Sequence, residues 1–404
     1  MSELRRRSLK DLVNEVKPGF ACGEVDANGV FQIRMNNVTK SGGIDLSKQR
    51  RVPRNHPGIE KSKLRPGDVL FNATNSPDLV GKTLFWSGID EEVVYSNHFQ
   101  RIRTDDEELD PKYLSRWLTS QFESGVFRGL CKQWVNQATV SKDSLLSLKI
   151  PLPPLAYQKR IAAVLDEVDI LRTKRREAIT LLDDLAQSIF LEMFGTGEGH
   201  PVVPLGEQLS FITSGGRGWA KYYSDSGSIF IRSLDVQMNS IEIDEVAYVQ
   251  APDNAEARRT RVEVGDVLLT ITGSRIGRVS AVPENLSGAY VSQHVAILRP
   301  VQEKIVPDFL SFFLSIPFGG QRQISDMQYG QTKPGLNFRQ IAEFLIPLPE
   351  VSLQRQFLDR VSRVRQLQES RARNLATLDE LFTSLQYRAF SGALWNYEAS
   401  GEAA

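Results

Sequence analysis

Few residues of this chain have both the types and the spacing that chemistry on a substrate would need. Residues 81–83 (Gly-Lys-Thr) match the end of a phosphate-binding loop, but that loop also needs a glycine at position 76, where the chain has a serine. Residues 15–17 have the Glu-x-Lys form of many nuclease sites, but only Asp11 precedes them. The pair at 153–154 (Pro-Pro) stands between leucines, so it does not form the Asn/Asp-Pro-Pro-Tyr signature of amino-methyltransferases. These patterns favour a chain that binds or organises other molecules.

Residues that could ligate a metal or act as a nucleophile are equally sparse. The chain has two cysteines, Cys22 and Cys131, and four histidines that lie far apart in the sequence. It contains neither the His-Glu-x-x-His pattern of zinc proteases nor the Gly-x-Ser-x-Gly turn of serine hydrolases. We interpret His98 and His294, which occupy matching positions, as structural histidines at strand starts. We therefore expect no catalytic residue, no metal and no cofactor in this chain.

Composition places the chain among ordinary globular proteins. Its 404 residues carry 49 Lys+Arg against 49 Asp+Glu, so the formal net charge is zero. That balance argues against coating nucleic acid by charge alone, but it is compatible with local basic loops. The most apolar window, residues 309–318, is half the ~20 residues that cross a bilayer, and the first residues lack the apolar core of a signal peptide. The sequence predicts a cytoplasmic protein.

An internal repeat organises the elements that would position any site. Residues 150–153 (Ile-Pro-Leu-Pro) recur at 346–349, 196 positions later. Residues 67–70 (Gly-Asp-Val-Leu) recur at 265–268, where the offset is 198. An offset that changes by two residues and then returns is typical of a duplicated domain with altered loop lengths. The repeat predicts the order domain, helix, domain, helix.

Each repeat ends in a long segment that contains neither glycine nor proline. These segments, residues 157–194 and 354–390, carry apolar residues spaced three and four apart, which predicts amphipathic helices. Each helix would be ~55 Å long at 1.5 Å per residue. Pairing as an antiparallel coiled coil would bury both apolar stripes, and separate packing on each domain is the alternative. The residues assigned to that pairing are Ile161, Val164, Val168, Leu171, Leu182, Leu185, Phe357, Val361, Val364, Leu367, Leu375 and Leu378.

The predicted fold class is therefore α+β, with two copies of a mixed α/β domain separated by two long helices in a pseudo-twofold arrangement. The predicted organisation is a first domain at 1–155, a helix at 156–195, a second domain at 196–350 that opens with a linker at 196–203, a second helix at 351–394 and a tail at 395–404. We interpret the charged helix middles, 172–177 and 369–373, as the solvated face of the coiled coil, and a contact surface for partner proteins is the alternative.

Two similar domains in one chain suit a target that is itself bipartite, and duplex DNA is such a target. Dimeric readers place their modules about one helical turn apart, ~34–36 Å, a distance that the long helices could set. Arg, Asn and Gln can bond base edges, and Lys, Ser and Thr suit phosphates. The loop residues with these properties are Arg34, Asn36, Asn37, Lys40, Asn72, Thr74, Asn75, Ser76 and Lys82 in the first domain, and Arg217, Trp219, Lys221, Tyr222, Arg232, Thr272, Ser274, Arg275 and Lys333 in the second.

The chain resembles the DNA-specificity subunits of Type I restriction–modification systems over essentially its full length. The resemblance is carried by the two Ile-Pro-Leu-Pro segments, each followed by a glutamine (Gln158 and Gln354) and a long helix. The repeated Gly-Asp-Val-Leu segments and the Ser-x-His segments at 96–98 and 292–294 also match. Their combination is specific to this family, whereas any one of the motifs is weak.

The resemblance implies that each domain is a target recognition domain that reads one half of a split DNA sequence, and that the helices fix the gap between the halves. It also implies docking of two methyltransferase subunits and two restriction subunits. Those partners would bind S-adenosylmethionine, ATP and Mg²⁺ and would carry out adenine methylation and cleavage. Two alternatives stay open: an enzyme with an unrecognised site, and a coiled-coil adaptor that binds protein without DNA specificity.

Overall fold

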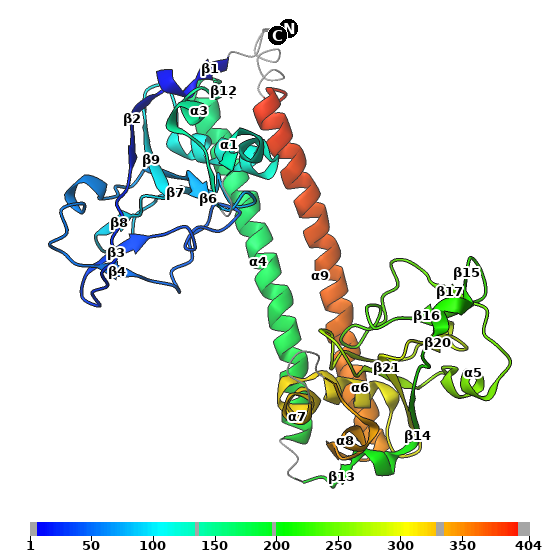
Figure 1. Cartoon of the computed structure of the whole chain (residues 1–404). Helices are drawn as coiled ribbons and strands as arrows, with labels where there is room; N and C mark the ends of the chain where they lie inside the picture. Colours follow the sequence, from blue (N-terminus) through cyan, green and yellow to red (C-terminus); the bar gives the residue numbers. More distant parts are fainter. Residues whose placement is uncertain (1–5, 134–136, 196–198, 329–334, 395–404) are drawn as a thin grey trace, which may run out of the picture. The chain divides into compact units, whose positions relative to one another are not determined.

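A computed structural model describes residues 6–133, 137–195, 199–328 and 335–394 (Figure 1). The chain divides into two compact units, one made of residues 1–176 and 373–404 and the other of residues 177–372. Each long helix therefore contributes one part to each unit. Of the helices within the described ranges, none is long and apolar enough to cross a membrane.

The first unit combines four small sheets with short helices. Its sheets have the strand orders β2-β9-β5-β7, β4-β3-β8, β10-β11-β6 and β1-β12. The elements are β1 (Arg6–Ser8), β2 (Val13–Pro18), β3 (Val30–Ile33), β4 (Arg51–Val52), β5 (Val69–Asn72), β6 (Thr74–Asn75), β7 (Thr83–Phe85), β8 (Val93–Tyr95), β9 (Phe99–Thr104), α1 (Pro111–Glu123), α2 (Val126–Leu130), β10 (Lys132–Gln133), β11 (Ala138–Thr139), α3 (Lys142–Leu146), β12 (Lys149–Pro151), and parts of α4 (Leu155–Phe194) and α9 (Val351–Ser391).

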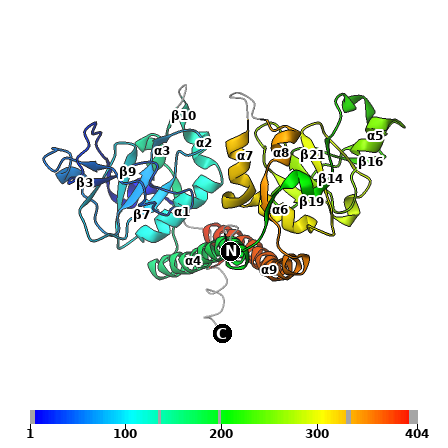
Figure 2. The ribbon, with the colours of Figure 1, turned by 90° about the horizontal axis from the view of Figure 1, so that it is seen from below.

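Both faces of the sheet β2-β9-β5-β7 are covered, which explains its apolar strands. Helix α1 lies against one face (Figure 2), where Val69 and Phe71 of β5 share a core with Tyr113. Leu70 points to the opposite face and packs with Phe31 of the sheet β4-β3-β8. Because side chains alternate along a strand, a continuous run of apolar residues is needed where both faces are buried.

The second unit repeats this plan. Its sheets have the orders β14-β21-β18-β19, β15-β17-β16-β20 and β13-β22. Besides the remaining parts of α4 and α9, its elements are β13 (Val202–Pro204), β14 (Leu209–Ser214), β15 (Tyr223–Ser224), β16 (Ser228–Ile231), β17 (Tyr248–Val249), α5 (Ala255–Thr260), β18 (Val267–Thr270), β19 (Val279–Ala281), β20 (Tyr290–Val291), β21 (Val295–Pro300), α6 (Pro307–Ser315), α7 (Arg322–Met327), α8 (Phe338–Ala342) and β22 (Leu345–Pro347).

The core of the second unit has the same two sides. Val267 and Leu269 of β18 pack with Phe309 of α6, whereas Leu268 packs on the other side with Ile231 of β16. In both units, successive residues of the equivalent strands β5 and β18 therefore pack on opposite faces of a sheet with the same strand order. The duplicated α+β fold predicted from the sequence is confirmed.

The first two residues of each Ile-Pro-Leu-Pro motif lie in a strand that pairs with the first strand of the same domain. Strand β12 pairs antiparallel with β1, and β22 pairs antiparallel with β13. The long helices begin directly afterwards, at Leu155 and Val351, one residue before and at the predicted starts of 156 and 351. Helical hydrogen bonding reaches back to the residue before each helix, since the carbonyls of Pro154 and Glu350 accept the main-chain N–H groups of the glutamines three residues into each helix.

Polar contacts join α4 to α9 within each unit. In the first unit Arg172 lies 2.5 Å from Asp379 and stacks on the Phe382 ring, 4.2 Å from its centroid. In the second unit the Gln368 amide donates to Asp183 at 2.7 Å. Partners earlier in one helix lie later in the other, as an antiparallel coiled coil requires. The predicted pairing of the two helices is therefore confirmed.

The predicted solvated face holds for most of the charged segment 172–177, but Arg172 departs from it. Thr173, Lys174, Arg176 and Glu177 are exposed, whereas the Arg172 side chain is only 16% exposed. Its guanidinium pairs with Asp169 as well as Asp379, and its planar face covers an aromatic ring. Arginine can cross-link helices in this way because it presents several donors and a flat, weakly hydrated surface.

Burial differs among the twelve residues assigned to the helix pairing. Two helices alone cover only a narrow stripe of each other's surface, so residues at its border keep contact with solvent. Those that are buried or half-buried are Ile161, Val168, Leu182, Phe357, Val361, Val364, Leu375 and Leu378, and those that are exposed are Val164, Leu171, Leu185 and Leu367.

Candidate nucleic-acid interface

The loop that follows β3 carries the most exposed cluster of candidate residues in the first unit. Arg34 begins this loop, and its main-chain N–H donates to the Asn37 side chain at 2.9 Å. The Asn37 amide is fully buried and donates in turn to the carbonyls of Asp45 and Lys48, each at 3.0 Å. The buried Asn37 side chain thus stabilises the loop conformation, while Asn36 is exposed.

Lys82 supports the same loop from inside the unit. Its ammonium group donates to the carbonyls of Met35 and Val38, and the residue is 5% exposed. Burial lowers the pKa of Lys82, because the charged form loses hydration. The lysine that the sequence suggested as a phosphate ligand therefore positions the loop that carries Arg34.

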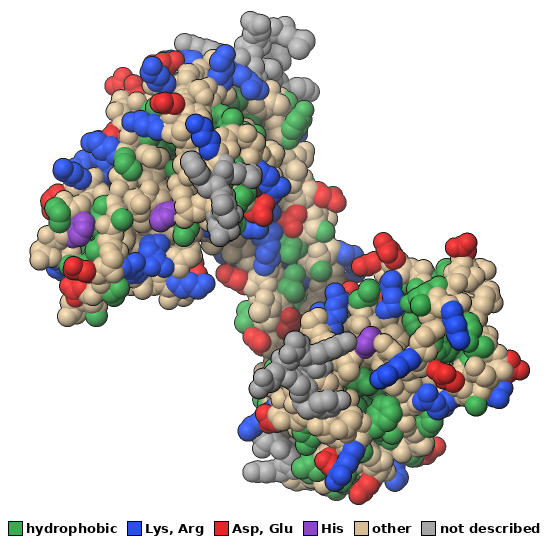
Figure 3. Space-filling model, in the orientation of Figure 1, with side chains coloured by type: hydrophobic (Ala, Val, Ile, Leu, Met, Phe, Trp, Pro, Cys, Tyr) green, Lys and Arg blue, Asp and Glu red, His purple; other side chains and the backbone are tan. Residues whose placement is uncertain are grey.

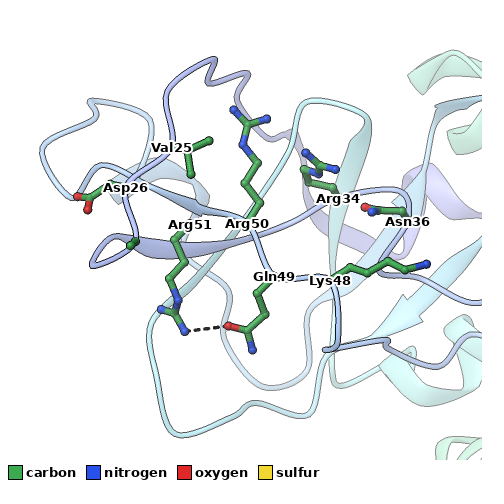
Figure 4. A pocket seen from close by; sticks show the side chains of 9 residues that line it. Val25, Asp26, Arg34, Asn36, Lys48, Gln49, Arg50 and Arg51 are labelled. Carbon is green, nitrogen blue, oxygen red and sulfur yellow. Dashed lines mark hydrogen bonds between the residues drawn. The ribbon is translucent and has the colours of Figure 1, made fainter.

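Arg34 and Asn36 line a surface hollow of about 630 Å³ in the first unit. Lys48, Gln49, Arg50 and Arg51 line it too, with Asp26 as the acidic member (Figure 4). Arg51 is held by Glu91, at 2.7 Å, and by Gln49. Arg50 donates to the main-chain carbonyls of residues 22–24. The hollow thus combines several cations with few carboxylates, which suits an anionic ligand.

A second hollow of about 380 Å³ adjoins the first and shares Arg34, Asn36 and Arg50 with it. The Ser-x-His segment at 96–98 lines its wall. The hydroxyl of Ser96 is buried and has no hydrogen-bond partner among the described residues. The hydroxyl of Ser292, at the matching position of the second copy, is buried and unpaired in the same way, so this feature belongs to the shared scaffold.

The equivalent loop of the second unit has a different charge arrangement. Arg232 follows β16, and its main-chain N–H donates to Asp235 at 2.7 Å, as Arg34 does to Asn37. The Arg232 guanidinium also binds both oxygens of the Asp235 carboxylate, at 3.1 and 3.0 Å. The hydrogen bond from its guanidinium to the Asp235 carboxylate raises the pKa of Arg232, although partial burial acts in the opposite direction. Asp235 is fully buried, so the ion pair is part of the fold.

Five of the candidate residues are buried and hold the protein together. In the first unit Asn72 donates to the carbonyls of Thr74 and His98, and Asn75 donates to Asn72. In the second unit Trp219 packs on Phe230 with ring centroids 5.5 Å apart. Direct contact with DNA would require these groups to leave satisfied, buried positions, which is unfavourable. We therefore do not place Asn37, Asn72, Asn75, Lys82 and Trp219 in the interface.

The remaining candidates lie in several separate loops. In the first unit Lys40 is exposed and Thr74 and Ser76 are half-buried, with Thr74 bonded to Thr139. In the second unit Thr272 contacts the His294 ring, and Arg275 donates to the Leu234 carbonyl at 2.9 Å. Lys333 lies outside the described residues. The others of the second unit are Arg217, Lys221 and Ser274, which are exposed, and Tyr222, which is half-buried.

The repeated motifs themselves are structural. In Gly-Asp-Val-Leu, Asp68 is buried and binds the Arg103 guanidinium at 2.6 and 3.2 Å. Asp266 binds Arg299 in the same way, at 2.7 and 3.0 Å. Each pair ties the start of one sheet strand to its neighbour, and the hydrogen bond to the carboxylate raises the pKa of both arginines. The repeat therefore marks the scaffold and leaves the reading surface to the loops.

Figure 3 shows Lys and Arg side chains interspersed with Asp and Glu on the visible face of each unit. Among the residues that the structure describes, no group of histidine, cysteine and acidic side chains is placed to hold a metal ion. The hollow beside Arg34 is thus distinguished by its local cations.

Of the residues that line that hollow, sequence reasoning named only Arg34 and Asn36 and missed, among others, the polar stretch Lys48, Gln49, Arg50 and Arg51. They lie at the end of a loop and at the start of β4 and belong to no motif of the repeat. A comparison of the two copies contained a usable signal, because this stretch is basic in the first domain and the matching stretch near 245 is acidic. Such a difference on a shared scaffold is expected where two copies bind different ligands.

The fold and the loops together define a class: a duplicated domain whose copies share a scaffold and differ in their surface loops, linked through paired helices. A family model described as the Type I restriction modification DNA specificity domain matches residues 59–181 and 246–379, more than half of the chain. The chain belongs to this family and is a specificity subunit of the Type I restriction–modification class.

Individual relatives agree with this assignment. The EcoBI specificity subunit of Escherichia coli is 24% identical over 96% of this chain and 86% of its own length. The EcoKI specificity subunit of Escherichia coli K12 is 22% identical over 90% of this chain and 82% of its own length. The S subunit structure from M. genitalium has a TM-score of 0.58 at 16% identity, and a chain from a structure of type I R-M complex assembly has 0.60 at 20%. Both structures cover 96% of this chain and share its fold.

Proposed function

We propose that this chain recognises a bipartite DNA sequence, with one target recognition domain reading each half. The observation that carries the proposal is the contrast between scaffold and loops. Asp68 with Arg103 and Asp266 with Arg299 form the same ion pair in the two copies. The loops after β3 and β16 differ in charge on this common frame. Identical frames with different loops are suited to reading two different half-sequences, by base contacts in the major groove.

We further propose that the chain acts through partners. It would dock two methyltransferase subunits and two restriction subunits, which would supply S-adenosylmethionine, ATP and Mg²⁺ and carry out all catalysis. A target adenine would be flipped into the methyltransferase, where its exocyclic amino group is accessible. The formal net charge of zero fits this division, because a complex can draw its phosphate contacts from several subunits. Such a complex would act on DNA in the cytoplasm.

Domain exchange tests the assignment of one domain to each half-site. Residues 200–345 are replaced with the matching domain of a relative that has a different target, and the methylated sequence is mapped by long-read sequencing of host DNA. We expect only one half of the methylated motif to change, while the other half and the gap stay the same. A change in both halves would show that the two domains do not read independently.

The two other classes of function make different predictions. An adaptor without DNA specificity would leave host DNA unmethylated at any split motif, even with an active methyltransferase subunit present. An enzyme with its own site would bind S-adenosylmethionine as the isolated chain, which equilibrium dialysis with the labelled cofactor would detect. The proposal predicts neither outcome, because the chain contributes recognition and its partners contribute chemistry.

A further inference from the structure

The loops that follow β3 and β16, residues 34–37 and 232–235, share the same main-chain hydrogen bonds. In both, the residue at the fourth position accepts the main-chain N–H of the arginine at the first. In both, the main-chain N–H of that fourth residue donates back to the arginine carbonyl, at 2.9 and 3.0 Å. The two arginines therefore leave the backbone at matching points of the fold, and any difference between them comes from side chains.

The fourth residue decides what each arginine does. In the second unit it is Asp235, whose carboxylate binds the Arg232 guanidinium, and the same guanidinium donates to the Glu245 carbonyl at 2.8 Å. In the first unit it is Asn37, which carries no charge. Its amide donates to the Lys48 carbonyl at 3.0 Å and so takes the place that Arg232 occupies in the second unit. Arg34 has no ion pair among the described residues.

Strand pairing shows which residues of the neighbouring segment correspond. The Gln32 N–H donates to the Arg50 carbonyl at 2.9 Å, and the Phe230 N–H donates to the Ala247 carbonyl at 2.8 Å. Arg50 therefore corresponds to Ala247, and Lys48, two residues earlier, corresponds to Glu245. The cations that surround Arg34 are replaced by an alanine and a glutamate beside Arg232. The two sites have opposite charge on one backbone frame.

We propose that Arg34 binds the DNA of the first half-site, together with Lys48 and Arg50, and that Arg232 is a structural residue that does not contact DNA. The proposal rests on the proposed function and assigns residues to it. The guanidinium would donate to oxygen or nitrogen acceptors of the DNA, either phosphate oxygens or the O6 and N7 atoms of a guanine. The second domain would then read its half-site from other loops.

The test uses the complex of this chain with its methyltransferase subunit, bound to a duplex that carries the methylated motif. Arg34→Gln should weaken binding roughly 5- to 150-fold, the range for losing one such contact. Arg232→Gln should leave DNA affinity within about twofold but lower the melting temperature, since the buried Asp235 carboxylate would lose its cationic partner and keep only the main-chain N–H bond. If that variant does not fold, a double variant removes the buried charge as well. Arg232→Gln with Asp235→Asn places at position 235 the uncharged residue type that the first loop has at Asn37, and it should fold and bind DNA as the wild type does.

Arg34→Lys separates the two sources of acceptors. For a phosphate contact, the lysine keeps most of the affinity, and Arg34→Gln lowers the salt dependence by about one counterion. For a guanine contact, the lysine variant also loses affinity, and the methylated motif relaxes at one position of the first half-site. Either pattern supports the proposal.

Two results would overturn the proposal while leaving the proposed function intact. One is a folded Arg34→Gln complex that binds and methylates as the wild type does. The other is an Arg232 variant that loses as much DNA affinity as Arg34→Gln without a change in melting temperature. A wild-type complex that binds no specific DNA sequence would instead overturn both this inference and the function on which it rests.

Discussion

At the scale of single residues, the glutamine that follows each Ile-Pro-Leu-Pro motif has a structural role. The Gln158 side chain accepts the Asp110 N–H at 2.9 Å and donates to the carbonyls of Glu108 and Pro153. Gln354 makes the same three bonds, to Val306, Lys304 and Pro349. Both glutamines are fully buried. Each one ties the start of a long helix to the turn before the helix that packs on the sheet, α1 in the first unit and α6 in the second.

Replacing either glutamine should loosen one unit and spare the other. Gln158→Ala leaves one buried N–H and two carbonyls unpaired, so it should lower the free energy of unfolding of the first unit by about 2–4 kcal/mol. Hydrogen exchange should then speed up at the Asp110 amide and remain slow at the Val306 amide. Gln354→Ala, as the matched control, should reverse this pattern. Equal acceleration in both units would contradict a local anchoring role.

At the scale of elements, the long helices carry two kinds of contact. Near the domains their apolar residues enter the cores, as Phe357 does in the second unit. Closer to the middle, polar pairs such as Arg172 with Asp379 and Gln368 with Asp183 join the helices. Polar pairs fix register more than they add stability, because buried charges lose hydration. Within each unit, these pairs therefore fix how α4 and α9 align with each other.

Shortening both helices should shorten the gap in the DNA target. Removing residues 177–180 and 371–374, which lie in sequence between the two polar pairs, shortens each helix by about 6 Å at 1.5 Å per residue. That distance corresponds to about two base pairs at ~3.4 Å each. We expect the methylated motif to keep both half-sites with a gap about two base pairs shorter. An unchanged gap in the methylation map would contradict the idea that the helices act as a ruler.

At the scale of the whole molecule, duplication explains both what could be predicted and what could not. The fold class and the family follow from repeated motifs that contain Gln158 and Asp68, because scaffold contacts constrain residue type in both copies. The helix pairing follows from the apolar spacing of the two long segments. The roles of Lys82 and Asn37 did not follow, since burial under a loop depends on tertiary packing that polarity alone does not indicate. Arg34 and Arg232 look equivalent in the sequence, and only the contacts of their side chains separate them.

The formal net charge of the whole chain bears on how the proposed interface would attract DNA. Equal numbers of acidic and basic residues leave no net attraction to DNA, so the proposed recognition would rest on local clusters such as the hollow beside Arg34. In the proposed complex, partner subunits would supply the further contacts with the DNA backbone that tight binding needs. Its central property would be the choice of sequence rather than the strength of binding.

The most direct test of that property is to co-express the chain with its methyltransferase subunit and to map adenine methylation on host DNA by long-read sequencing. We predict a single split motif, with two defined half-sites separated by a fixed number of unspecified base pairs. An intact, active complex that methylates a continuous motif, or adenines without sequence preference, would contradict the account.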